Sequence, residues 1–178
     1  MGLAIYYYDT LDNTNDEAKK LVENYNISSG LIITDIQHNG RGRFGNKWVS
    51  MKDNFMGSFF FQVNSYKDIK KLQLDFLNIL LNCLKKVFKF NNFVIKEPND
   101  ILLHQKKISG ILVESFKFKN KLFAVVGIGL NLVKSPTLSN YPTTSLYKKF
   151  KKKITIRHGY LGLLVPYLER CCFLFATP

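Results

Sequence analysis

A polar hairpin between residues 94 and 116 holds the side chains best suited to chemistry in this 178-residue sequence. Two apolar, β-prone runs flank it, a Pro98-Asn99-Asp100 turn stands at its start, and a lysine followed closely by a glycine comes after the turn. A fixed carboxylate beside a cation and exposed backbone can bind a phosphate with its counter-ion. Asp100 is suited to hold Mg²⁺, directly or through water, because Mg²⁺ prefers one or two carboxylates plus phosphate oxygens. The alternative role for Asp100 is an Asx-turn.

A second candidate site is the glycine-bearing loop Gly40-Arg41-Gly42-Arg43-Phe44-Gly45. A dinucleotide-binding turn of this pattern must lead into a helix, whereas this loop leads to Trp48 and a strand. Its backbone N–H groups and two guanidinium groups are suited to an anion, and the alternative is a mobile surface loop with incidental charge. Trp48 offers a stacking face for a purine, or else it pins the loop to the core.

The elements that position these groups mix strands and helices without a regular βαβ repeat. Several strands are hairpin neighbours, which predicts an α+β fold with a mixed, largely antiparallel sheet and helices on one side. The long polar segment 37–54 is predicted to be a functional loop. Strands are predicted at 3–8, 30–36, 56–63, 94–103, 107–116 and 122–128, and helices after a cap at Asn13 or Thr14, over 67–89, and from 155 to about 173.

Composition and charge narrow the class of protein. Apolar residues make up 46% of the chain, which excludes a disordered protein, and the length fits one domain over residues 1–178. The net charge of +13 is typical of proteins with nucleic-acid or acidic partners. The lysines are scattered, so we interpret the charge as compositional bias, with attraction of an acidic or phosphate-bearing partner as the alternative. The basic run at 148–153 is predicted to be a solvated loop.

The cysteines and the apolar segments bear on location. Cys83, Cys171 and Cys172 form no Cys-x-x-Cys pair, which fits a reducing cytosol. The chain shows neither a signal peptide nor an apolar run long enough to span a membrane. We therefore expect a cytoplasmic protein without a membrane partner.

Five motifs in this order resemble those of biotin protein ligases. Three positions depart from the family pattern: Asn13 replaces a serine, Asn46 an arginine and Glu97 a tryptophan. The motifs are Asn13-Thr14-Asn15, the loop from Gln37 to Trp48, the segment from Pro98 to Glu114, Gly127-Ile128-Gly129-Leu130-Asn131, and Thr144-Ser145-Leu146.

The resemblance implies a fold like that of class II aminoacyl-tRNA synthetases, as found in the biotin/lipoate ligase superfamily. It implies an ATP-dependent ligase that forms biotinyl-5′-AMP with the help of Mg²⁺. Biotin is then transferred to a lysine of a biotin carboxyl carrier protein. We expect no nucleic-acid partner, because no helix-turn-helix segment precedes the motifs. We also expect that the small C-terminal β-barrel of many relatives is absent.

The resemblance also assigns roles to individual residues. Lys107, Arg43 and Asp100 are the implied catalytic residues at the phosphate bridge, and Asp100 is the implied Mg²⁺ ligand. The implied biotin-binding residues are Asn13, Thr14, Asn15, Gln37, Gly40, Arg41, Gly42, Lys107 and Gly110. The implied nucleotide-binding residues are Arg41, Gly42, Arg43, Trp48, Asn99, Lys107 and Asn131.

Two other functions stay open at this point. A lipoate or octanoate protein ligase shares the sheet and a lysine near a glycine, although the Gly-Arg-Gly-Arg loop argues against it. A basic nucleic-acid-binding protein is the other alternative. Steeply salt-dependent binding to unrelated duplexes, without biotin affinity, would favour the latter.

Overall fold

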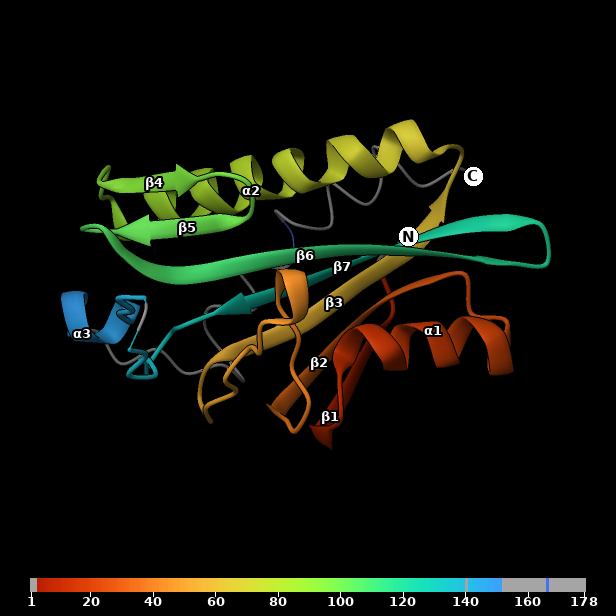
Figure 1. Cartoon of the computed structure of the whole chain (residues 1–178), viewed down its shortest axis with the longest axis horizontal. Helices are drawn as coiled ribbons and strands as arrows, with labels where there is room; N and C mark the ends of the chain where they lie inside the picture. The colour runs from red at the N-terminus through yellow and green to blue at the C-terminus, as the bar shows by residue number, and fades with distance from the viewer. Residues whose placement is uncertain (1–2, 140, 152–165, 167–178) are drawn as a thin grey trace.

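A seven-stranded sheet with the order β1-β2-β3-β7-β6-β5-β4 forms the centre of the molecule (Figure 1). The structure is a computed structural model and describes residues 3–139, 141–151 and 166. The helix predicted from 155 to about 173, with Cys171 and Cys172, lies outside these residues except at residue 166. In the described part of the chain, we find no helix with both the length and the apolar character needed to cross a membrane.

The observed elements follow the predicted order closely. The strand predicted over 94–103 is two strands, separated by the Pro98-Asn99 turn. The strands are β1 (Ile5–Leu11), β2 (Ser29–Gln37), β3 (Phe55–Val63), β4 (Phe93–Lys96), β5 (Asp100–Leu103), β6 (Lys106–Phe118) and β7 (Lys121–Leu130). The helices are α1 (Thr14–Tyr25), α2 (Tyr66–Phe88) and α3 (Leu146–Phe150), with one 3-10 turn, η1 (Arg43–Gly45), in the long loop.

The pairing of the strands confirms the predicted fold class. β1 runs parallel to β2, and the other neighbouring strands of the sheet pair antiparallel. The fold is therefore α+β with a mixed, largely antiparallel sheet. The two strands of the β6–β7 hairpin pair along their length, from Ser109 with Leu130 to Phe118 with Lys121. This register places the glycines of both strands near one another.

The helices cover both faces of the sheet, so the prediction that they lie on one side is wrong. Phe59 and Phe61 of β3 point into the core under α2, whereas Phe60 points into a second core under α1. Figure 1 shows α1 next to β2 and α2 next to β4. The physical reason is the composition of β3, which is apolar at nearly every position, as a strand must be when both of its faces are buried.

Helix α2 builds the larger core. It starts where the Ser65 backbone N–H donates to the Asp68 carboxylate at 2.9 Å, and it buries one apolar face. The Phe76 ring lies with its centroid 5.7 Å from that of Phe59 and 6.5 Å from that of Phe61. This aromatic cluster fixes β3 against α2 and so fixes the face of the sheet that lies opposite.

Helix α1 begins with a polar first turn. Of the two predicted caps, Asn13 is the N-cap, and its Oδ1 accepts from the backbone N–H groups of Asn15 at 2.8 Å and Asp16 at 3.4 Å. Ala18, Leu21 and Val22 bury the opposite stretch of the helix against the sheet. Packing of this apolar face therefore holds the polar first turn, residues 13–16, over the middle of the sheet.

The basic run at 148–153 is in part a helix and not only a loop. Lys148 and Lys149 lie in α3 with exposed side chains, and Phe150 packs on Phe88 with ring centroids 4.7 Å apart. Ser145 caps α3 by accepting from the Lys148 backbone N–H at 3.2 Å. Phe150 is the only apolar residue in the run at 148–153, which is why the sequence predicted a solvated loop there.

We expect Phe76→Ala to lower the free energy of unfolding by about 3–5 kcal/mol, because it empties the centre of the aromatic cluster. Leu74→Ala on the same helix is the matched control, since Leu74 is 48% exposed while Phe76 is fully buried. Its effect should stay within about 0.5 kcal/mol. Urea unfolding curves of the two variants provide the measurement, and equal shifts would contradict the packing described.

Candidate functional site

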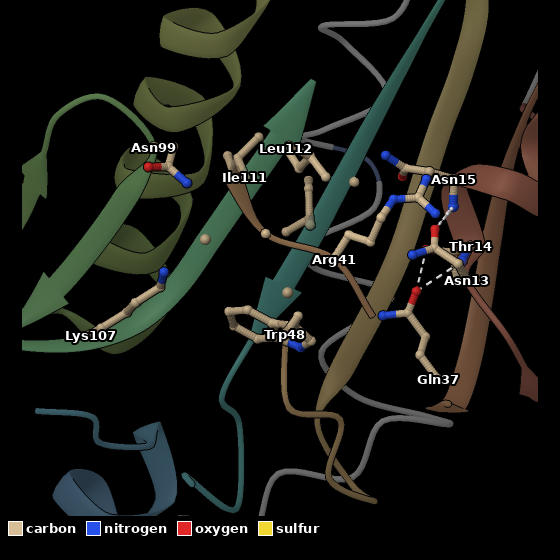
Figure 2. Close-up of a pocket in the computed structure, with 15 residues that line it drawn as sticks. Asn13, Thr14, Asn15, Gln37, Arg41, Trp48, Asn99, Lys107, Ile111 and Leu112 are labelled. Atoms are coloured by element: carbon tan, nitrogen blue, oxygen red, sulfur yellow. Dashed lines mark hydrogen bonds between the residues drawn. The ribbon is translucent and has the colours of Figure 1, made fainter. Parts of the chain in front are cut away.

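One pocket on the α1 face of the sheet brings together residues from distant parts of the sequence. Its empty space, open mouth included, is about 450 Å³. In Figure 2 Gln37 and the start of α1 lie on one side of Trp48, and Asn99 and Lys107 lie on the other. The predicted site residues that line it are Asn13, Thr14, Asn15, Gln37, Arg41, Gly42, Trp48, Asn99, Lys107 and Gly110.

Glycines in β7 make the floor of the pocket. A Cβ at Gly127 would lie 2.5 Å from Asn15 Oδ1, and a Cβ at Gly129 would lie 2.3 Å from the Trp48 ring. Glycines inside a strand predict close approach of the backbone to a ligand, whereas here the groups that approach are the chain's own side chains. Gly110 of β6 pairs with Gly129 and extends the same bare surface.

The side chains of the Asn13-Thr14-Asn15 box form the polar end of the pocket. The Thr14 backbone N–H donates to Gln37 Oε1 at 2.8 Å, and Asn13 Nδ2 donates to the Asn39 carbonyl at 2.9 Å. These bonds attach the start of α1 to the end of β2 and to the long loop. Both Asn13 and Thr14 are buried.

Ser58 and Glu114 form hydrogen bonds with this box although they do not line the pocket, and no role was predicted for either from the sequence. Ser58 Oγ lies 2.6 Å from both Thr14 Oγ1 and Asn15 Oδ1, and Asn15 Nδ2 donates to Glu114 Oε2 at 2.7 Å. A signal existed for Ser58, because it interrupts the apolar strand β3. Glu114 is the last residue of the Gly-Ile-Leu-x-Glu motif, so the sequence held a signal for it as well.

Arg41 stands at the mouth of the pocket between two carboxylates. Its Nη1 and Nη2 donate to the two oxygens of Asp16 at 2.5 and 2.8 Å, and Nη2 also donates to Glu114 Oε2 at 3.1 Å. The hydrogen bond from Arg41 lowers the pKa of Asp16 and the same bond raises the pKa of Arg41. The guanidinium is thus held in place by α1 and β6 together.

Lys107 pairs with the carboxylate of the Pro98-Asn99-Asp100 turn. Its Nζ lies 2.6 Å from Asp100 Oδ1, and Tyr141 donates its hydroxyl to Asp100 Oδ2 at 3.0 Å. The ammonium also lies 5.7 Å from the Trp48 ring and 5.5 Å from the Tyr141 ring. Burial raises the pKa of Tyr141. No feature of the sequence pointed to Tyr141.

The start of the Thr144-Ser145-Leu146 motif and the segment that leads into it form backbone hydrogen bonds with Lys107. The Thr144 N–H donates to the Lys107 carbonyl at 3.0 Å, and the Lys107 N–H donates to the Pro142 carbonyl at 2.9 Å. Asn131, 2% exposed, donates from Nδ2 to the Thr144 carbonyl at 3.2 Å. Asn131 therefore joins two motifs here and does not line the pocket.

Two further predicted residues shape the loop outside the pocket. Arg43 lines a neighbouring cavity, with its guanidinium carbon 4.8 Å from the centre of the Phe44 ring. Gly40 accepts the Trp48 N–H at 2.9 Å, and a Cβ there would lie 2.6 Å from the Trp48 carbonyl. The loop thus forms a narrow hairpin that carries Trp48 onto the glycine floor. The Nε1–H of Trp48 is buried and meets no acceptor in the described part of the chain.

The comparisons with known proteins agree with this site. Residues 7–131 match the profile of the Biotin/lipoate A/B protein ligase family, and the chain belongs to that family. It is 32% identical over 150 residues to biotin–protein ligase 2 of Arabidopsis thaliana, which covers 82% of this chain and 44% of the relative. It is 35% identical over 133 residues to the biotin–[acetyl-CoA-carboxylase] ligase of Paracoccus denitrificans, covering 70% and 53%.

Solved structures match the whole described fold. The biotin protein ligase of Aquifex aeolicus in complex with biotin and ATP superposes with a TM-score of 0.75 at 27% identity, over 96% of this chain and 69% of that one. The chain spans about half the length of the curated relatives it matches. The resemblance identified from the motifs is thus confirmed at the level of family and fold.

We expect Gly129→Ala to push the Trp48 ring off the floor of the pocket, because a methyl group there overlaps the indole. Trp48 is the only tryptophan, so its fluorescence reports on the ring directly. The emission should shift to longer wavelength as the ring meets water. Gly127→Ala is the matched control, since its methyl group meets Asn15 instead. An unchanged emission in Gly129→Ala would contradict the contact.

Proposed function

We propose that this protein is an ATP-dependent ligase that activates biotin as biotinyl-5′-AMP and transfers biotin to a lysine of a biotin carboxyl carrier protein. The observation that carries the proposal is the single pocket in which the box at 13–15, the loop residues Arg41 and Trp48, and Lys107 meet over the glycine floor. The Aquifex aeolicus biotin protein ligase, which has the same fold, was solved in complex with biotin and ATP, and this supports biotin and ATP as the substrates of the present protein.

The polar end of the pocket favours biotin over lipoate. Asn13, Thr14 and Asn15 line the pocket there and are buried, and their side chains carry hydroxyl and amide groups. The ureido ring of biotin offers N–H donors and a carbonyl acceptor to such groups. The dithiolane ring of lipoate offers neither, and a site whose buried polar groups stay unpaired rejects a ligand strongly.

The cations of the site suit the first step. In that step an oxygen of the biotin carboxylate bonds to the α-phosphorus of ATP, and pyrophosphate leaves. Two anions must approach each other, so positioned cations lower the barrier. Lys107 lines the pocket, and Arg41 stands at its mouth. Arg43 is proposed at the phosphate bridge, from its place on the adjoining turn of the loop.

The second step needs an open path to the adenylate. The carrier's lysine amine bonds to the acyl carbon of biotin, AMP leaves, and the amine loses its proton to solvent. No enzyme nucleophile takes part. The pocket opens between the loop and β6, which is where a lysine side chain can enter.

Mg²⁺ is part of the proposal through Asp100. Both oxygens of this carboxylate are engaged, one by Lys107 and one by Tyr141. Among the described residues no group of three His, Cys, Asp or Glu side chains is placed to hold a metal. Asp100 would be the residue to hold a Mg²⁺ bound with the phosphates of ATP, directly or through water, because Mg²⁺ prefers one or two carboxylates plus phosphate oxygens. Bound there, Mg²⁺ would neutralise charge on the phosphates.

We expect the purified protein to catalyse ATP–pyrophosphate exchange that depends on biotin. The exchange isolates the first step and needs no carrier. Lipoate at the same concentration is the control and should give only background, for the reason argued from the polar end of the pocket. Equal or faster exchange with lipoate would contradict the assignment of biotin.

Lys107→Ala should slow adenylate formation about tenfold to more than a hundredfold, because one charge-assisted contact is worth roughly 1.5–3 kcal/mol. Lys106→Ala is the matched control, since Lys106 is its exposed neighbour at the start of β6. Single-turnover formation of biotinyl-AMP gives the measurement. If both variants lose the same activity, the pocket-facing lysine has been assigned wrongly.

A further inference from the structure

We propose that Ser58 and Glu114 are positioning residues that set the direction of a hydrogen-bond chain and so fix the Thr14 hydroxyl as an acceptor toward the ligand. The chain runs from Thr14 through Ser58 and Asn15 to Glu114. This inference deepens the proposed function and rests on it, because the ligand group that it serves is a ring N–H of biotin.

The chain is fixed first at its anionic end. Glu114 Oε2 lies 2.7 Å from Asn15 Nδ2 and 3.1 Å from Arg41 Nη2. A carboxylate paired with a guanidinium only accepts hydrogen bonds. Asn15 must therefore turn its NH₂ group toward Glu114, which leaves its carbonyl oxygen facing Ser58.

The proton of Ser58 is fixed next. Its Oγ lies 2.6 Å from Asn15 Oδ1 and 2.6 Å from Thr14 Oγ1. Asn15 Oδ1 carries no proton, so the single hydroxyl proton of Ser58 must go to it. The short contact between the two hydroxyl groups then requires that Thr14 donates to Ser58.

The direction of the hydrogen bond from the Thr14 hydroxyl follows from that of Ser58. The Thr14 hydroxyl also lies 3.1 Å from Gln37 Oε1, but the contact with Ser58 Oγ is shorter, at 2.6 Å, and has no other proton to bridge it. With its one proton given to Ser58, Thr14 Oγ1 keeps lone pairs for a donor in the pocket that Thr14 lines.

Burial makes this direction hard to reverse. Ser58 is fully buried, and Thr14 and Asn15 are 3% and 5% exposed. Polar groups in such a place must be paired consistently, because an unpaired donor or acceptor there is costly. The four side chains come from α1, β3 and β6, so the arrangement is a property of the fold and not of one loop.

The test compares biotin with two cyclic carbamate analogues, in which an oxygen replaces one or the other ring N–H. The replacement keeps the shape and turns a donor into an acceptor. Dissociation constants are measured by calorimetry on the wild-type protein, Ser58→Ala, Glu114→Gln and the control Glu23→Gln, which makes the same change at the exposed end of α1. A urea unfolding curve checks the fold of each variant.

We expect the wild type to prefer biotin over one carbamate by on the order of a hundredfold. In Ser58→Ala and Glu114→Gln this ratio should fall about tenfold, because the Thr14 hydroxyl is then free to turn and donate. Glu23→Gln should keep the wild-type ratio. A merely structural role would weaken both ligands alike and leave the ratio unchanged.

The remaining outcomes separate the two levels of the argument. Wild-type protein that binds no biotin overturns the proposed function and this inference with it. Wild-type binding with an unchanged ratio in both variants overturns the inference alone. A change in Glu114→Gln only would mean that the effect runs through Arg41, and it too overturns the chain, because Ser58→Ala leaves the Arg41 pair intact.

Discussion

The missing side chains of Gly127 and Gly129 are the constraint on which the site depends. A central strand buried on both faces would normally fill the space above it with its own side chains. At these two positions β7 instead leaves room, and Asn15 and Trp48 enter it from α1 and from the long loop. The Asn13-Thr14-Asn15 box and Trp48 are thereby brought onto one floor, between strands whose register is fixed by the β3–β7–β6 pairing.

The two faces of the sheet carry different features: the larger apolar core lies on the α2 side, and the polar pocket lies on the α1 side. On the α2 side, Phe59, Phe61 and Phe76 form a continuous aromatic core. On the α1 side, Phe60 of β3 packs in the smaller apolar core. Two residues earlier on the same face of β3, Ser58 places a buried hydroxyl group. A polar site can be tolerated there because the opposite face, together with the far half of α1, provides most of the buried apolar surface.

Each cation of the pocket is held by the chain's own carboxylates. Arg41 is paired with Asp16 and Glu114, and Lys107 is paired with Asp100. A partly buried charge without a partner is costly, so these pairs keep the cations in place. Cations that are already positioned would need little rearrangement as negative charge develops in the proposed reaction, which is the condition for electrostatic catalysis.

The sequence by itself determined the order of the elements, a helix cap at Asn13 or Thr14, and the motifs, because periodicity, capping and turn chemistry act between residues close in the chain. It also identified the family. Only the tertiary structure decided that α1 and α2 take opposite faces, and that Ser58 and Glu114 meet Asn15 from 43 and 99 residues away. Such contacts depend on strand register and on which face each helix covers. Those features are set by packing of the whole sheet, and no local pattern specifies them.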